Sequence, residues 1–211
     1  MKNLIFDIDG TLWNTTAVVA GAWNKAVKEL AVPELSKLNV TDKILQREFG
    51  KPMDVIADDL FGPIDSKVKA GLLSLCCSYE HEAIEANTED LSYEKVRETM
   101  HELSLNHNLY IVSNCQDGYI ELVIKKNGLE NVIKDYECFG HTGLQKDENI
   151  VLLMERNGLK KEDCCYIGDT MGDYIATKKA GITFVFARYG FGEVEKPDIC
   201  VDSFEELSKV L

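Results

Sequence analysis

Short apolar runs that stop at glycine or at small polar residues constrain the fold of this chain most strongly. A strand buried on both faces of a parallel sheet has a continuous apolar run instead of an alternating pattern. Four such runs predict buried strands, at residues 4–6, 109–112, 164–167 and 183–186. Helical periodicity between the later runs predicts helices that each end at a glycine, over residues 116–127, 147–157 and 173–180. This alternation predicts an α/β fold with a doubly wound parallel sheet.

Residues 15–87 break the alternation. They contain no convincing strand, and their apolar periodicity predicts helices over residues 17–30, 42–49, 53–60 and 66–84. We therefore expect an all-helical cap at residues 15–87, inserted into a core formed by residues 1–14 and 88–211. Such an insertion could be a lid over a site or a packing subdomain that does not move.

Charge and composition limit the partners. The 211 residues carry a formal net charge of -13, which repels nucleic acid and anionic membrane surfaces, so neither is an expected partner. No apolar run approaches the roughly 18 residues of a membrane span, and no secretory signal is evident, so we expect a cytoplasmic protein. The seven cysteines include no Cys-x-x-Cys spacing, and we expect them to be reduced and structural.

Polar residues that follow the predicted strands carry the candidate chemistry. In an open parallel sheet, ligands bind beyond the carboxyl ends of the strands. The residues expected there are Asp7, Asp9, Gly10, Thr11, Ser113, Asn114, Asp169, Thr170 and Asp173, and Lys146 begins a helix that could face the same edge. Several carboxylates at one place repel each other unless a cation neutralises them. Magnesium suits such hard oxygen ligands.

These residue types predict phosphoryl transfer. A carboxylate facing a phosphoryl group, here Asp7, can act as a nucleophile and form an acyl phosphate that water hydrolyses. Asp9 could protonate the leaving oxygen and later deprotonate the attacking water. Lys146, the Ser113 hydroxyl and backbone amides could stabilise the charge on the phosphoryl oxygens.

Four motifs in order carry a family resemblance. Residues 7–12 (Asp-Ile-Asp-Gly-Thr-Leu), residues 111–114 (Ile-Val-Ser-Asn), Lys146 and residues 168–173 (Gly-Asp-Thr-Met-Gly-Asp) resemble the signatures of the haloacid dehalogenase-like (HAD) hydrolase superfamily, and of its phosphoglycolate phosphatase-like branch. The chain departs from the family at Asn14, where an acidic residue is usual, and at Asp147, where proline is frequent.

The resemblance implies a Rossmann-like core with a helical cap after the first strand, and magnesium-dependent phosphatase catalysis through a phosphoaspartate. The roles it implies are catalysis by Asp7 and Asp9, phosphate binding by Thr11, Ser113, Asn114 and Lys146, and metal binding by Asp7, Asp9, Asp169 and Asp173. At Asp9 the metal ligand would be the backbone carbonyl.

The substrate class stays open at this point. A phosphoglycolate-like ester, a sugar phosphate and a nucleotide all present the same terminal group, so the prediction is a small phosphorylated metabolite. A phosphosugar mutase would use the same chemistry, and a phospho-accepting receiver module would use similar residues. A receiver module should be shorter and should lack the long insertion. The protein is expected to be a monomer or a homodimer.

Overall fold

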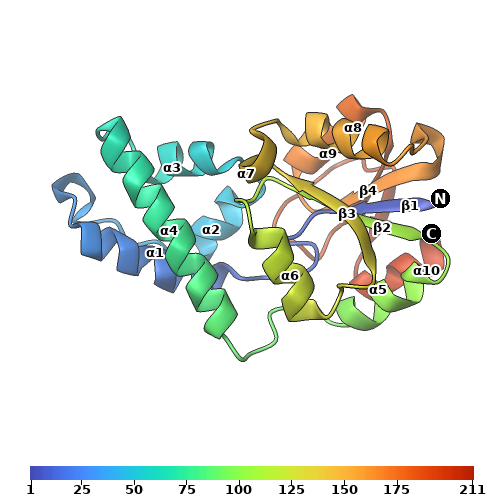
Figure 1. Ribbon diagram of the computed structural model, residues 1–211, viewed down its shortest axis with the longest axis horizontal. Coiled ribbons are helices and arrows are strands. Elements are labelled where there is room, and N and C mark those ends of the chain that lie inside the picture. Colours follow the sequence, from blue (N-terminus) through green and yellow to red (C-terminus); the bar gives the residue numbers. More distant parts are fainter. The chain divides into compact units, whose positions relative to one another are not determined.

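The computed structural model describes residues 1–211, and its internal contacts divide the chain into two compact units (Figure 1). The sheet unit comprises Met1–Asn14 and Leu91–Leu211. The helical unit comprises Thr15–Asp90. None of the helices combines the length and the hydropathy that a membrane span requires.

The sheet unit contains one six-stranded parallel sheet with the strand order β3-β2-β1-β4-β5-β6. Its strands are β1 (Asn3–Phe6), β2 (Asn108–Ser113), β3 (Ile133–Cys138), β4 (Cys164–Gly168), β5 (Thr183–Ala187) and β6 (Ile199–Val201). This is the order of a doubly wound Rossmann-like fold, whose direction of winding reverses at β1. In the central strands, Phe6 lies opposite Ile111 and Ile167, so the segments that follow these three strands begin at the same edge. The predicted fold class is confirmed.

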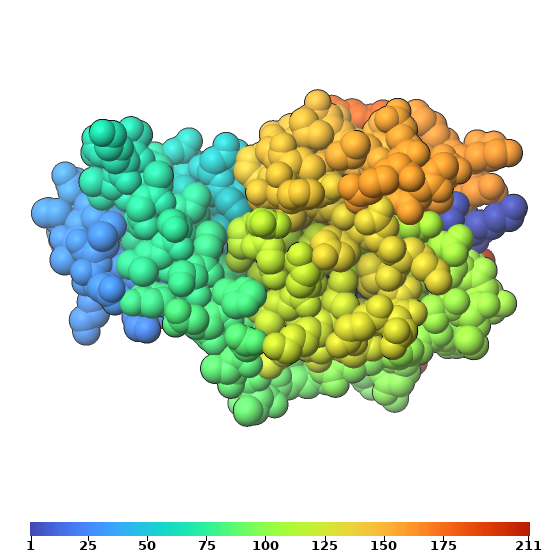
Figure 2. Space-filling model, in the orientation of Figure 1, coloured from blue at the N-terminus to red at the C-terminus, as the bar shows by residue number.

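Helices cover both faces of this sheet (Figure 1). One face carries α8 (Lys146–Arg156) and α9 (Met171–Ala180), and the other carries α5 (Val96–Ser104), α6 (Tyr119–Asn127) and α10 (Leu207–Val210). Because side chains alternate along a strand, Ile5 joins the core beneath α8 and α9, whereas Phe6 packs on Phe204 of the opposite layer. Leu4, Ile5 and Phe6 of β1 are 0% exposed, and in the space-filling view the start of the chain is visible only at the right, in dark blue (Figure 2). The central strands are therefore buried on both faces, as their apolar runs predicted.

Two strands, β3 and β6, were not predicted, nor were the helices α5 and α10 and a short helix after β3. β3 lies at one edge of the sheet and is only partly buried, and its sequence, Ile-Lys-Asp-Tyr-Glu-Cys, mixes charged with apolar residues. β6 has three residues and lies at the other edge. The helix α5 precedes β2, and the short helix α7 (Phe139–Thr142) follows β3.

The helical unit contains α1 (Thr16–Leu30), α2 (Asp42–Glu48), α3 (Met53–Phe61) and α4 (Ser66–Ala86), with a 3₁₀ turn at Pro33–Leu35 and no strand. Trp23 of α1 is fully buried, and its indole Nε1 donates a 2.8 Å hydrogen bond to Glu80 Oε2 of α4. The ring of Trp23 also lies 6.1 Å from that of Phe61. The aromatic packing and the satisfied buried carboxylate join α1, α3 and α4 into one core.

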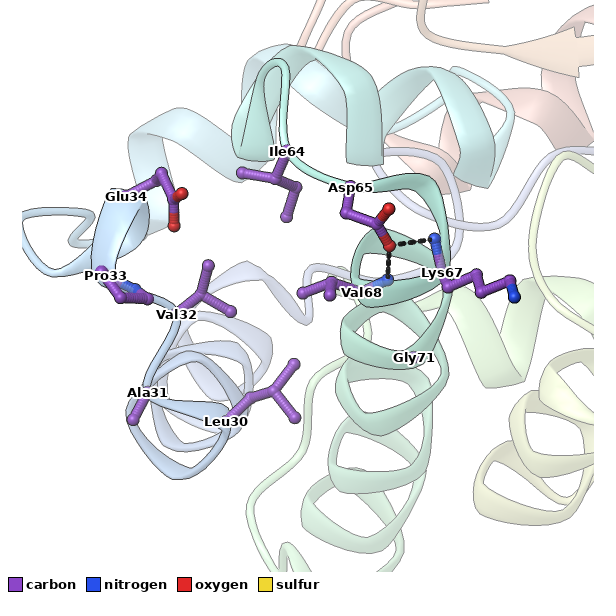
Figure 3. Close-up of a pocket in the computed structure, with 10 residues that line it drawn as sticks. All are labelled: Leu30, Ala31, Val32, Pro33, Glu34, Ile64, Asp65, Lys67, Val68 and Gly71. Carbon is purple, nitrogen blue, oxygen red and sulfur yellow. Dashed lines mark hydrogen bonds between the residues drawn. The ribbon is translucent and has the colours of Figure 1, made fainter.

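A cavity of about 470 Å³ lies within the helical unit, between the end of α1 and the start of α4 (Figure 3). Leu30, Val32, Ile64 and Val68 form its apolar walls. Asp65 lies at its edge, where its carboxylate caps α4 by accepting hydrogen bonds from the Lys67 and Val68 amides. None of the predicted site residues lines this cavity.

Candidate active site

Three buried carboxylates meet at the carboxyl ends of β1 and β4. Asp7 directly follows β1, Asp169 directly follows β4, and Asp173 lies in the first turn of α9. Each offers an oxygen within 4.8 Å of the others, and all three are at most 1% exposed. The fold thus brings Asp7 together with two residues more than 160 positions away. We refer to these three residues as the carboxylate cluster.

Lys146 places an ammonium group against the carboxylate cluster. Its Nζ donates hydrogen bonds of 2.9 Å to Asp7 Oδ1 and 2.5 Å to Asp173 Oδ1. Burial alone would lower the pKa of Lys146, but the charges of Asp173 and Asp7 outweigh it and raise the pKa above its usual value. Lys146 is therefore held as a charged group in the interior, with its position set by the first turn of α8.

Asp173 has structural partners on both of its carboxylate oxygens. Its Oδ2 accepts hydrogen bonds from the Thr170 amide (2.9 Å) and hydroxyl (2.7 Å), while Thr170 Oγ1 accepts from the Asp173 amide (3.1 Å). This reciprocal capping box fixes the start of α9. The other oxygen of Asp173 faces Lys146. One aspartate therefore both starts a helix and orients the lysine.

Asp169 is enclosed by backbone. Its Oδ2 accepts a 2.7 Å hydrogen bond from the Phe191 amide, and its Oδ1 lies 3.3 Å from the Thr11 hydroxyl that donates to it. A Cβ atom at Gly10, which has a φ of +83°, would lie 2.1 Å from Asp169 Oδ2, and one at Gly190 would lie 2.3 Å from Asp169 Cβ. Only glycine permits this close approach. Thr11 was predicted to bind phosphate, and here its hydroxyl donates to Asp169.

The carboxylate cluster contains more negative charge than Lys146 can balance. Burial, together with the charge of Asp173, raises the pKa of Asp7 to about 6 against the opposing effect of Lys146. Burial, with the charges of Asp173 and Asp7, raises the pKa of Asp169 well above its usual value. Three buried carboxylates facing one ammonium favour a divalent cation, because it would supply the missing positive charge to oxygen ligands. The residues therefore fit a metal site.

Asp9 lies outside the carboxylate cluster and has a different partner. Its Oδ1 accepts a 2.9 Å hydrogen bond from the hydroxyl of Tyr119, at the start of α6. The Tyr119 ring is buried and packs edge-on against Trp13, with the ring centres 5.7 Å apart. The turn that carries Asp9 is closed by a 2.9 Å hydrogen bond from the Gly10 amide to the Trp13 carbonyl. Tyr119 was not predicted as a site residue because its position on a helical apolar face indicated only packing.

Ser113 and Asn114 occupy the end of β2, beside β1, and both are buried. Nearby, the Tyr166 hydroxyl donates a 2.7 Å hydrogen bond to the Val112 carbonyl and lies 3.4 Å from Asp7 Oδ1. Tyr166 thereby ties β4 to β2 across β1. The sequence signals Tyr166 only through the alternation of side chains in β4, which places it on the same buried face as Cys164.

A Rossmann-like sheet with buried carboxylates and a lysine at the ends of β1 and β4 defines a class of α/β proteins suited to a cation and an anionic ligand. The chain belongs to the haloacid dehalogenase-like hydrolase family, whose sequence model matches residues 4–187. This match confirms the predicted family.

Individual relatives are distant but align over the full length. The chain is 26% identical to a phosphoglycolate phosphatase of Vibrio parahaemolyticus, over 100% of this chain and 96% of the relative. It resembles the crystal structure of a predicted phosphoglycolate phosphatase from Haemophilus somnus, with a TM-score of 0.83, 21% identity, and coverage of 100% and 97%. A HAD-hydrolase from Bacillus subtilis, solved bound to magnesium, matches with a TM-score of 0.75 and 19% identity, over 100% and 98% of the two chains.

Proposed function

We propose that this protein is a phosphatase that hydrolyses a small phosphate monoester through a phosphoaspartate formed on Asp7. The observation that carries the proposal is the carboxylate cluster with Lys146, which presents one carboxylate at the edge of the sheet where ligands bind. Membership of the hydrolase family and full-length similarity to proteins named phosphoglycolate phosphatase support it. They favour a phosphoglycolate-like ester among the candidate substrates.

The metal in this proposal is magnesium, held by Asp7, Asp169 and Asp173, with the backbone carbonyl of Asp9 as a further ligand. The ligand set consists of hard oxygen donors, which magnesium prefers, and the neighbour from Bacillus subtilis was solved bound to magnesium. When bound, the ion supplies positive charge that neutralises the carboxylates and the phosphoryl oxygens.

The chain's own groups then have distinct tasks. Asp7 attacks phosphorus and forms the phosphoaspartate, and Lys146 keeps the Asp7 carboxylate in one orientation through its 2.9 Å hydrogen bond. Asp9 protonates the leaving oxygen and afterwards removes a proton from the attacking water. Ser113, Asn114 and Thr11 are the proposed phosphate contacts, with Lys146 as the nearby positive charge.

The proposal is tested by measuring inorganic phosphate released from a panel of esters that includes 2-phosphoglycolate, hexose phosphates and nucleoside monophosphates. Asp7→Asn keeps the size of the side chain and removes the nucleophile, so we expect phosphate release to fall by about 10⁴-fold or more. A chelator should stop the wild-type enzyme, and added magnesium should restore it. Near-normal turnover by Asp7→Asn would show that Asp7 is not the nucleophile. Isomer formation from a hexose 1-phosphate without phosphate release would favour a phosphosugar mutase.

A further inference from the structure

Two cysteines that are distant in sequence meet beside the segment proposed to bind phosphate. Cys115 comes directly after Ser113 and Asn114, and Cys138 is the last residue of β3. Ser113 and Cys138 are paired residues of the neighbouring strands β2 and β3. Beyond this pair, the Gly140 amide donates a 2.9 Å hydrogen bond to the Cys115 carbonyl. The two strand ends therefore run side by side at the level of the thiols.

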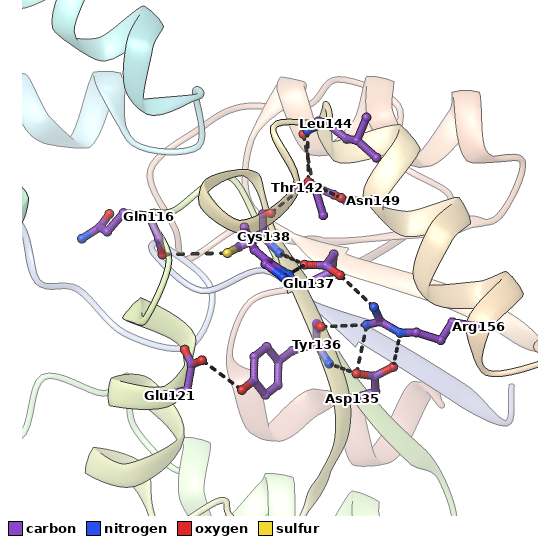
Figure 4. A network of polar contacts seen from close by, with 11 residues as sticks. Gln116, Glu121, Asp135, Tyr136, Glu137, Cys138, Thr142, Leu144, Asn149 and Arg156 are labelled. Carbon is purple, nitrogen blue, oxygen red and sulfur yellow. Dashed lines mark hydrogen bonds and ion pairs between the residues drawn. The ribbon is translucent and has the colours of Figure 1, made fainter. Parts of the chain in front are cut away.

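The Cys138 side chain contacts this segment as well. Its thiol donates a long hydrogen bond, 3.9 Å, to the carbonyl oxygen of Gln116, the residue directly after Cys115 (Figure 4). The strand pairing and these contacts place Cys138 beside residues 113–116, which include Cys115. Both side chains are buried but not fully closed off, with exposed fractions of 7% for Cys115 and 4% for Cys138.

This thiol pair differs from the other buried cysteines. The neighbouring Cys115 thiol lowers the pKa of Cys138, although burial and the charges of Asp117 and Glu137 oppose it. Burial raises the pKa of Cys115 well above its usual value, which keeps that thiol protonated. Burial also raises the pKa of Cys165 to about 12. Since the thiolate is the reactive form of cysteine, Cys138 is the more reactive member of the pair.

We propose that Cys115 and Cys138 form a redox site that a hydroperoxide oxidises to a disulfide, and that the disulfide displaces the adjacent Ser113–Asn114 segment. In the first step the Cys138 thiolate attacks the peroxide, so that an S–O bond forms, the O–O bond breaks, and the released alkoxide or hydroxide takes a proton. In the second step the Cys115 sulfur attacks the sulfenic acid, the S–O bond breaks, and the hydroxide leaves as water with the proton of Cys115. Two thiols are oxidised and one peroxide is reduced.

The disulfide has a structural consequence for the neighbouring segment. An S–S bond is about 2.05 Å long, which is much shorter than any contact between unbonded sulfur atoms, so the two thiols must move closer together to form it. Cys115 is bonded directly to Asn114, so a movement of Cys115 is transmitted to the end of β2. If Ser113 and Asn114 bind the phosphoryl group, which rests on the proposed function, a displacement of about 1 Å would reduce turnover on the order of 10²-fold.

The experiment compares the wild-type protein with Cys115→Ser, Cys138→Ser and the control Cys76→Ser/Cys77→Ser, whose thiols lie in the helical unit. Each protein is treated with hydrogen peroxide, digested without reduction, and mapped by mass spectrometry; a parallel sample is assayed for phosphate release before and after dithiothreitol. We expect a Cys115–Cys138 linked peptide in the wild type and the control. Turnover of both should fall about 10²-fold and recover on reduction, whereas the two single variants should keep their activity.

Two results would overturn the proposal. One is a wild-type map in which Cys138 becomes sulfinic acid, or stays reduced, with no linked peptide. The other is a linked peptide with unchanged phosphate release. Should the untreated protein release phosphate from no ester at all, the proposed function would fail, while the peptide map would still decide whether the redox site exists.

Discussion

Two clusters in the sheet unit combine aspartate or glutamate with basic side chains, and their electrostatics are opposite. At the edge strand β3, Arg156 binds Asp135 through Nε and Nη2, at 2.8 and 3.0 Å, and Glu137 through Nη1, at 2.8 Å (Figure 4). His141 adds a 2.8 Å contact to Glu137. Although burial opposes it, these hydrogen bonds lower the pKa of both Asp135 and Glu137. We call these four residues the β3 network.

In the carboxylate cluster the balance of charge is reversed, because three buried carboxylates share one ammonium group. The pKa of Asp7 and that of Asp169 are raised, whereas those of the two acids in the β3 network are lowered. Structural ion pairs are expected to be satisfied within the protein, and functional sites are where charge is left for a ligand to complete. The comparison thus separates a cluster that stabilises a strand edge from one whose excess of carboxylates fits a cation.

Among the substitutions that compare the two clusters, Lys146→Met should have the largest effect. Without its ammonium group, Asp7 and Asp173 lose their only cationic partner, which costs about 3–5 kcal/mol of unfolding free energy for a buried pair. Phosphate release should fall by about 10²–10³-fold, as for the loss of one group that stabilises transition-state charge. Urea unfolding without added metal and a phosphate assay measure the two effects.

The matched control for this substitution is Lys179→Met. Lys179 makes a 3.6 Å ion pair with Asp147 but is 62% exposed, so its loss should change the unfolding free energy by less than about 0.5 kcal/mol. Equal stabilities for Lys146→Met and the control would show that the buried cluster does not depend on its lysine.

Tyr119→Phe should have an intermediate effect that is confined to catalysis. It removes the hydroxyl that donates a hydrogen bond to Asp9 and so orients this carboxylate. It keeps the ring that packs on Trp13. We expect kcat to fall about 10-fold with KM nearly unchanged, because a misoriented acid slows proton transfer without weakening binding. Tyr136→Phe, which loses a 3.0 Å contact to Glu121, is the control. A rise in KM alone would argue against a positioning role for Tyr119.

Arg156→Met should affect stability and leave catalysis unchanged. Arg156 is 40% exposed, so solvent screening reduces the cost of its loss to about 1–2 kcal/mol of unfolding free energy. Phosphate release should stay within about twofold of wild type, since surface substitutions away from the site seldom alter chemistry. Arg188→Met, which breaks the 2.6 Å pair with Asp202 between two exposed side chains, should cost less. A large loss of activity in Arg156→Met would link the β3 network to the site.

The same two clusters show what could be predicted from the sequence. The residues of the carboxylate cluster follow continuous apolar runs, and ligands bind at the carboxyl ends of parallel strands, so the sequence alone predicted that these residues lie together. β3 lacked that signal, because an edge strand exposes part of its surface. Its Asp135 and Glu137 have the composition of a loop, and only the position of Arg156 beside them explains two acids in a strand.

Contacts between distant segments limited the prediction in a second way. The Tyr119–Asp9 hydrogen bond spans 110 positions, and nothing in the apolar periodicity of α6 indicates that the Tyr119 hydroxyl donates to a distant carboxylate. Cys115 and Cys138 were expected to be merely structural, since their spacing matches no known thiol motif. Their pairing depends on β3 lying beside β2, and β3 was the strand that the sequence did not reveal.

The smallest expected effect is on the pH dependence of stability, and it also distinguishes the two clusters. The pKa of Glu137 is lowered from 4.5 and that of Asp135 from 3.8, so each contributes stability that is complete above its ordinary pKa and is lost as the pH falls through its lower folded value. The stability difference between wild type and Arg156→Met should therefore be constant above about pH 5 and shrink towards pH 3. His141, whose pKa is raised, stays protonated as the pH falls from about 5 to about 3. Asp7 and Asp169 titrate alike in both proteins and cancel in the difference. Urea unfolding of both proteins across this range measures it, and a difference that grows on acidification would mean that Arg156 does not hold these carboxylates ionised.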